Sequence, residues 1–130
     1  MNRFLWVLQI VLGLYWVAIG ITHFILPAGL PAAMAWMYEL SPELHLISGT
    51  LEILGGLGLL IPGFIKRFAF LVPLAALGLV FVMFGAMVWH IQHGSFATTG
   101  PLNIALVLTL SLIAWGRWKR APLGVKASAS

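Results

Sequence analysis

The chain has 130 residues, of which 62% are hydrophobic and only 8% are charged, and its mean hydropathy is +1.06. An ordinary soluble domain carries roughly 25% charged residues, so this composition excludes that class and places the surplus apolar surface in lipid. The net charge of +4 is too small for a nucleic-acid-binding surface, and the absence of cysteine excludes disulfides, thiolate metal sites and covalently bound haem.

Four membrane-spanning helices are predicted, at about 4–26, 42–61, 68–91 and 101–116. No Asp, Glu, Lys or Arg occurs from residue 4 to residue 38, and none occurs from residue 68 to residue 116. As one helix the second stretch would be roughly 70 Å long, more than twice the ~30 Å hydrocarbon core, so the chain must turn back within it. The glycine, serine and threonine residues of 94–101 are the expected turn.

Local signals mark the ends of these helices. The first is longer than the apolar region of a cleaved signal peptide, so we expect it to be retained. Ser41–Glu43 supplies an N-cap, a first-turn proline and a carboxylate, and it should begin the second helix. Pro73 should bend the third helix, and the short fourth helix could begin a few residues before Pro101. Three apolar residues at helical spacing predict a short interfacial helix between the first two spans: Leu30, Met34 and Met37.

The basic residues predict the orientation. All seven lie near the N-terminus, in the 62–67 loop or after residue 116, which four crossings place on one side. By the positive-inside rule, both termini are cytoplasmic and the chain is a multi-pass protein of the plasma (inner) membrane. We expect a single transmembrane domain over 1–120 and a disordered cytoplasmic tail over 121–130.

The three acidic residues and the four histidines lie in the half of the predicted bundle that is opposite the basic residues. Glu52 alone lies deep in a helix, close to the predicted middle of the membrane. A carboxylate there costs roughly 2.5–3.5 kcal/mol on insertion scales, unless it is protonated or paired. Ionisable residues inside a membrane usually have a function, although a purely structural hydrogen bond between helices remains an alternative for Glu52.

Helical spacing predicts the surroundings of Glu52. His45, Ser48 and Glu52 share one face of the second helix, and the first helix carries a stripe of small, aromatic and polar residues: Gln9, Gly13, Trp16, Gly20 and His23. If the two faces pack together, His23 lies a turn or two from Glu52. The glycines would let the backbones approach and leave room for a ligand, with Trp16 as a flat wall. We therefore predict five ligand-binding residues: His23, Glu52, Trp16, Ser48 and Asn103. The alternatives are a solvated His23 near the headgroups and a helix-capping role for Asn103.

His90 and His93 have the i, i+3 spacing found in some metal sites. They lie where the third helix is expected to leave the membrane, so water can satisfy both rings. We predict no metal site there. His45 is expected to be an interfacial residue without a special role.

Three segments resemble the DoxX-like family of small four-helix membrane proteins: Gly20-Ile21-Thr22-His23-Phe24-x-x-Pro27, Ser48-Gly49-x-x-Glu52-Ile53-Leu54-Gly55-Gly56, and Lys66-Arg67-x-Ala69. The similarity covers nearly the whole chain, and the second segment is the most specific. The family is named after a subunit associated with archaeal thiosulfate:quinone oxidoreductase, and other members look like membrane partners of redox or detoxification proteins. The resemblance implies the four-helix fold and a redox association.

Two functions of different kinds follow from these observations. The first is a quinone-reactive or redox-associated membrane subunit that binds an amphipathic ligand near His23 and Glu52, with a non-covalent quinone as the cofactor. The second is a non-catalytic scaffold or chaperone-like subunit. The expected partners are the lipid bilayer, a soluble redox protein and a second copy of the chain, but no nucleic acid. Whether the protein is an enzyme stays open at this stage. A transporter is disfavoured, because 130 residues would need an oligomer to form a path.

Overall fold

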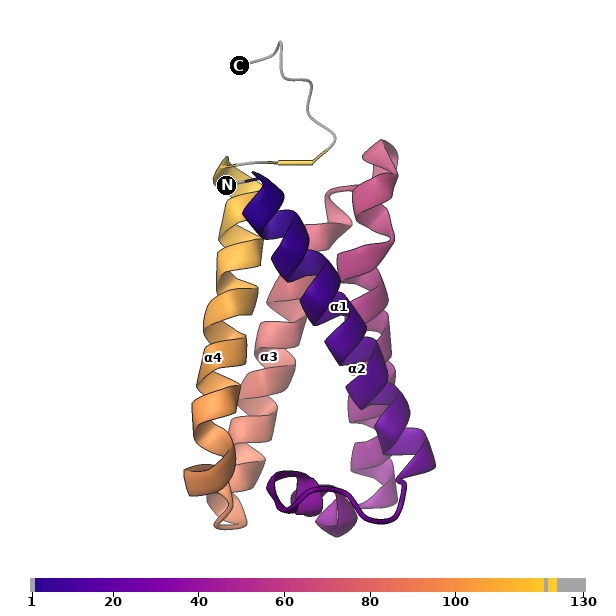
Figure 1. Ribbon diagram of the computed structural model, residues 1–130, viewed down its shortest axis with the longest axis vertical. Coiled ribbons are helices and arrows are strands. Elements are labelled where there is room, and N and C mark those ends of the chain that lie inside the picture. The colour runs from indigo at the N-terminus through magenta and orange to yellow at the C-terminus, as the bar shows by residue number, and fades with distance from the viewer. Residues whose placement is uncertain (1, 121, 124–130) are drawn as a thin grey trace.

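A computed structural model describes residues 2–120 and 122–123, and this part of the chain is helical, without a strand (Figure 1). The four long helices are α1 (Asn2–Ile25), α2 (Pro42–Leu60), α3 (Leu71–Gln92) and α4 (Phe96–Trp115). Each is long and apolar enough to cross a membrane, so the predicted all-α four-helix architecture is confirmed. Most of the predicted tail over 121–130 lies outside the described residues, although Leu123 packs against the core.

The helices pack as a bundle in which α1 lies against α2, and α3 lies against both α2 and α4. Figure 1 shows α1 crossing the bundle obliquely, with its beginning beside the end of α4. The two ends of the described chain therefore lie at the same end of the bundle, as four crossings require. That this end faces the cytoplasm remains a prediction from the basic residues.

The beginning of α2 follows its sequence signals. The Ser41 hydroxyl accepts a hydrogen bond from the Leu44 backbone amide at 3.2 Å, and Pro42 occupies the first turn. The helix ends at Leu60, just before Pro62. Two short 3₁₀ helices, η2 (Pro62–Phe64) and η3 (Lys66–Phe68), then lead into α3.

The structure gives no reason for the predicted bend at Pro73. α3 begins at Leu71 and not at residue 68, so Pro73 lies in the first turn. The amides of a first turn have no intrahelical partner, and a proline there removes no hydrogen bond.

The fourth helix begins at Phe96, five residues before the predicted bound at 101, which agrees with the expectation that it could begin before Pro101. The turn between α3 and α4 is correspondingly short and contains Gly94, whose φ of 74° is in the left-handed region that glycine readily adopts. Pro101 lies inside α4. Its ring leaves the Ala97 carbonyl without an intrahelical partner. Ala97 is exposed in the first turn, at the end of the bundle, where water can reach it.

The predicted interfacial segment is a 3₁₀ helix, η1 (Ala32–Glu39), which lies across the end of the bundle opposite the chain termini (Figure 1). The Tyr38 hydroxyl donates a hydrogen bond to the Pro27 carbonyl at 2.5 Å and accepts one from the Leu30 amide at 3.1 Å. Met37 is completely buried. These contacts hold η1 over the bundle.

The opposite end of the bundle is held together by a buried arginine, which is one of the seven basic residues that predicted the orientation. Arg117 lies in a π-helical turn, η4 (Gly116–Arg120), and is only 2% exposed. Its Nε donates to Gln9 Oε1 at 2.7 Å and its Nη1 donates to Asn2 Oδ1 at 2.6 Å. Gln9 Nε2 in turn donates to the Leu59 carbonyl at 2.9 Å. The network therefore joins α1, α2 and the end of α4.

Candidate functional site

The interface between α1 and α2 is built on glycines. A Cβ atom at Gly56 would lie 2.7 Å from the Gly13 carbonyl oxygen, and one at Gly49 would lie 3.0 Å from the Gly20 carbonyl oxygen. The two backbones are therefore in direct contact, as small residues allow in membranes. The close approach was predicted, but the expected room for a ligand between these helices was wrong, because the backbones themselves fill it.

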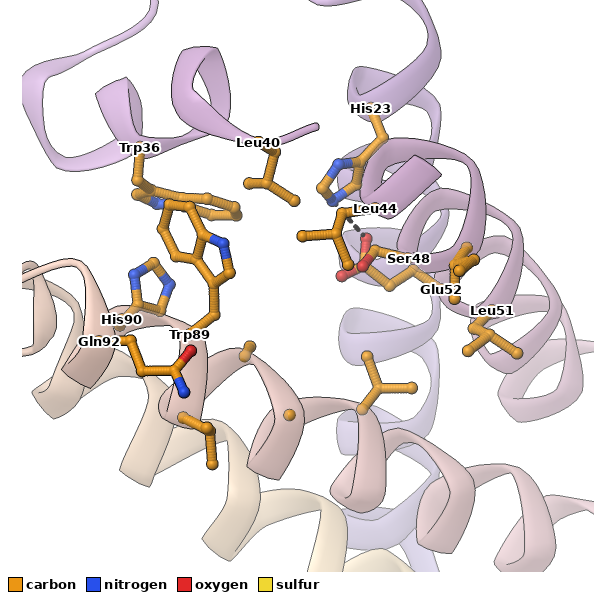
Figure 2. Close-up of a pocket in the computed structure, with 15 residues that line it drawn as sticks. His23, Trp36, Leu40, Leu44, Ser48, Leu51, Glu52, Trp89, His90 and Gln92 are labelled. Carbon is orange, nitrogen blue, oxygen red and sulfur yellow. Dashed lines mark ion pairs between the residues drawn. The ribbon is translucent and has the colours of Figure 1, made fainter. Parts of the chain in front are cut away.

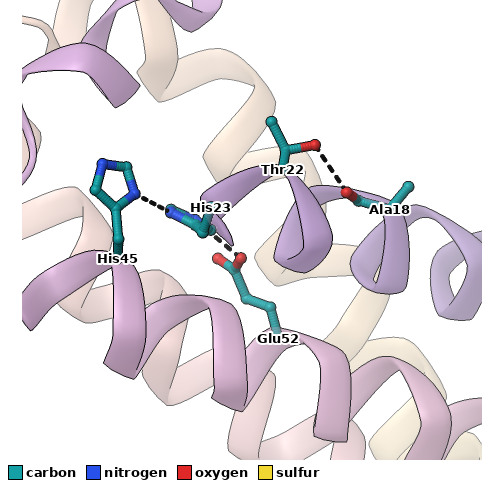
Figure 3. Close-up of polar contacts among 5 residues, drawn as sticks. All are labelled: Ala18, Thr22, His23, His45 and Glu52. Atoms are coloured by element: carbon teal, nitrogen blue, oxygen red, sulfur yellow. Dashed lines mark hydrogen bonds and ion pairs between the residues drawn. The ribbon is translucent and has the colours of Figure 1, made fainter. Parts of the chain in front are cut away.

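This close packing brings the predicted pair together. His23 Nε2 on α1 lies 3.1 Å from Glu52 Oε2 on α2 (Figure 3). The residues are 4% and 6% exposed, so the contact is buried. Its geometry is that of an ion pair and not of an aligned hydrogen bond, and both atoms are left without a hydrogen-bond partner in the described part of the chain. Both atoms are also covered from solvent, so a polar group of a ligand or a water would reach them only after a small displacement of the neighbouring side chains.

A third residue extends the pair. His45 Nδ1 lies 2.9 Å from His23 Nδ1, so one ring donates a hydrogen bond to the other. Figure 3 shows the three side chains in a row, His45, His23 and Glu52. The sequence had assigned His45 no special role. Its helical spacing from Glu52 was visible, but the direction of the His23 ring was not.

A partly open cavity of about 360 Å³ lies beside this row and is bordered by α2, α3 and η1 (Figure 2). Glu52 and His23 form part of its wall, and Ser48 lies on the same wall. Most of the other lining side chains are apolar and come from α2 and α3: Leu44, Ile47, Leu51, Val82, Ala86 and Val88. The ligand-sized space is thus between α2 and α3, and not between α1 and α2.

The wall facing Glu52 is aromatic and polar. Trp36 of η1 and Trp89 of α3 have ring centroids 6.3 Å apart, and Trp36 meets the His90 ring edge-on at 4.8 Å. Figure 2 shows these rings and Gln92 on the side of the cavity opposite Glu52. His90 Nδ1 also contacts Ser95 Oγ at 2.7 Å, which fixes the ring against the α3–α4 turn. Sequence reasoning missed this wall, because tryptophans near helix ends usually belong to the interfacial belt.

Two of the five predicted ligand-binding residues do not line the cavity. Trp16 is 2% exposed within the hydrophobic core, and Asn103 of α4 is 7% exposed. The indole nitrogen of Trp16 and the amide nitrogen of Asn103 are both buried without a hydrogen-bond partner among the described residues. His23, Glu52 and Ser48 are the predicted residues that the fold brings together.

His90 and His93 point to different surroundings. His90 is buried at the cavity, whereas His93 is exposed, stacks on Trp89 at 3.9 Å and has its Nδ1 2.9 Å from the Trp89 carbonyl. Within the described residues, no group of three or more His, Cys, Asp or Glu side chains could hold a metal ion. The absence of a metal site at this pair remains a prediction.

Replacing Glu52 should reveal how much the contact with His23 stabilises the bundle. Glu52→Gln keeps the shape and a polar group, so we expect normal folding. Glu52→Leu removes both, and we expect a loss on the order of 0.6–2 kcal/mol, the scale of polar contacts between membrane helices. Thr50→Leu, at an exposed position of the same helix, is the matched control. Thermal unfolding in detergent measures the effect, and equal stability of wild type, Glu52→Gln and Glu52→Leu would show that no such contact exists.

Comparison with known proteins adds one finding. A family model described as the DoxX-like family matches residues 7–115, which include most of α1, the whole of α2, α3 and α4, and the cavity. No curated protein and no solved structure matches the chain.

Proposed function

The chain belongs to the DoxX-like family and is a multi-pass membrane protein, and on this premise we propose that it is a redox-associated subunit of the plasma membrane. In this proposal the cavity beside Glu52 binds a planar, amphipathic ligand of the quinone class. The observation that carries the proposal is the pair of buried atoms, His23 Nε2 and Glu52 Oε2, which have no hydrogen-bond partner among the described residues and belong to side chains in the wall of a largely apolar cavity.

The residues of the cavity fit such a ligand. A quinone needs an apolar slot for its ring and a hydrogen-bonding group for each carbonyl oxygen. His23 and Glu52 supply polar atoms on one side, and His90 and Gln92 supply them on the other. Trp36 and Trp89 offer aromatic surfaces to the ring. When bound, a quinone would supply two-electron, two-proton redox chemistry.

The part that the protein would play is to hold the ring and to exchange protons. Neutral His23, or ionised Glu52, can accept a proton from a bound hydroxyl group, and the short distance between them allows the proton to be shared. The apolar walls exclude water from the ring. The electrons would pass to a soluble redox protein, which is the partner that we propose.

Photo-labelling with a short-tailed azidoquinone tests the proposal. We expect label on the 85–92 segment of α3 and on Trp36. Glu52→Gln and His23→Ala should each lower labelling about tenfold or more, because a hydrogen bond to a charged group contributes roughly 1.5–3 kcal/mol. Glu43→Gln, which changes an exposed carboxylate on the same helix, should have no effect.

The second candidate is a non-catalytic scaffold or chaperone-like subunit. It is favoured by the position of the His23–Glu52 contact, which links α1 to α2 next to their glycine interface. Label spread evenly over lipid-facing residues, and unchanged by Glu52→Gln and His23→Ala, would leave only this function.

A further inference from the structure

The row formed by His45, His23 and Glu52 runs from the η1 end of the bundle into its interior. Glu52 lies deep in the bundle, whereas His45 is on the first turn of α2, beside η1, and is partly exposed. The two contacts in the row are 2.9 Å and 3.1 Å long, and both lie within the range over which protons transfer once the groups align. We propose that this row is a proton path that connects Glu52 with the water at the η1 end of the bundle, and with that end alone.

One proton can enter the row and be passed on by two transfers between its members. A proton that binds His45 Nε2 makes that ring cationic, and the ring then passes its Nδ1 proton to His23 Nδ1. His23 passes its Nε2 proton to Glu52 Oε2, which becomes neutral. Both rings end in the opposite tautomer and are reset by rotation or by the reverse transfer. His45 Nε2 is itself covered, so proton entry needs a small displacement of η1 or of the ring.

The other end of the bundle is closed to Glu52. Along α2, Glu52 is followed by Gly56, whose backbone touches Gly13 of α1, and by Leu59, which is completely buried. Leu12 and Trp16 of α1 belong to the same core. Between Glu52 and the end that holds the chain termini, the described residues of this core include no histidine or carboxylate that could carry a proton.

Few other titratable groups lie near Glu52. Tyr15 and His23 approach Glu52 from α1, His45 lies on its own helix, and His90 faces it from α3 across the cavity. The six basic residues in the described part of the chain all belong to the opposite end of the bundle: Arg3, Lys66, Arg67, Arg117, Lys119 and Arg120. This inference concerns the protein without ligand, so it stands or falls separately from the proposed function.

The chain is well suited to a direct test, because its only acidic residues are Glu39, Glu43 and Glu52. In Glu39→Gln/Glu43→Gln protein, Glu52 is the last side-chain carboxyl. Dicyclohexylcarbodiimide labels protonated carboxyl groups in apolar surroundings. Its rate of reaction with Glu52, measured by peptide mass spectrometry, therefore reports protonation. Right-side-out and everted membrane vesicles, with different pH values inside and outside, control the two faces independently.

We expect labelling to follow the pH at the η1 face, by up to about tenfold per pH unit, which is the limit for one bound proton, and to ignore the pH at the other face. His45→Gln should abolish the rapid response to the η1 face, whereas His93→Gln, at the same end but outside the row, should not. Dependence on the opposite face, or an unchanged response in folded His45→Gln protein, would overturn the proposal. Labelling that never varies with pH would also overturn it. The same holds if Glu52 is never labelled and the infrared spectrum has no band of a protonated carboxyl group. If His45→Gln fails to fold, the dependence of the parent protein on the two faces still decides the question.

Discussion

Gly56→Ala is expected to push α1 away from α2 and to destabilise the protein by about 1–3 kcal/mol, the usual cost of overpacking. The added Cβ would lie 2.7 Å from the Gly13 carbonyl oxygen and 2.8 Å from the Val17 amide nitrogen. Both are backbone atoms, which cannot rotate away as a side chain can. The helices must therefore separate, and the contact between His23 and Glu52 should lengthen with them. Unfolding in detergent or bicelles measures the loss.

Gly78→Ala is the matched control for this substitution. Gly78 lies inside α3, and a Cβ atom there would meet nothing within 4 Å. Because alanine favours a helix over glycine, the protein should keep its stability or gain up to about 1 kcal/mol. A similar response to Gly56→Ala and Gly78→Ala would contradict the close backbone contact between α1 and α2.

Arg117→Met is expected to destabilise the end of the bundle that holds the chain termini, by on the order of 2–3 kcal/mol. The substitution keeps a long, flexible side chain but removes the donors to Gln9 and Asn2. The carbonyl oxygen of the Gln9 side chain then stays buried without that donor, which costs about 1–3 kcal/mol by itself. The stacking of the guanidinium over Trp6, at 5.3 Å, is lost as well.

Lys119→Met makes the same change of charge at an exposed position two residues away. Surface substitutions of this kind change stability by less than about 0.5 kcal/mol. The loss of stability of Arg117→Lys should lie between those of Arg117→Met and Lys119→Met, because lysine keeps the charge and loses the forked geometry of the guanidinium. Equal unfolding temperatures for Arg117→Met and Lys119→Met would show that the buried network contributes nothing.

The spacing of polar residues and glycines along the first two helices was sufficient to predict the contact between His23 and Glu52. Both residues lie on helix faces that also carry glycines, and the 3.6-residue period fixes which side chains share a face. Once two glycine faces pack together, the polar residues on them must meet. The same reasoning predicted that Ser48 would lie beside Glu52, which the cavity confirms.

The far wall of the cavity could not be predicted in this way. Trp36, Trp89 and His90 come from η1 and α3, and their meeting depends on how these elements dock. The docking of α3 depends on contacts such as that between Gly55 and Leu79, where an added Cβ would lie 2.5 Å from the leucine side chain. That of η1 depends on the hydrogen bonds of Tyr38. Neither contact follows a period in the sequence.

The sequence by itself determined that the chain is a four-helix membrane protein with an ionisable residue at depth. These conclusions follow from hydropathy and helical period, which are properties of single helices. Only the tertiary structure decided where a ligand-sized space exists, that His45 extends the polar row, and that Arg117 is buried. These depend on distances between helices, because a glycine can equally close one interface, as Gly56 does with α1, or leave open space, as Gly78 does on α3.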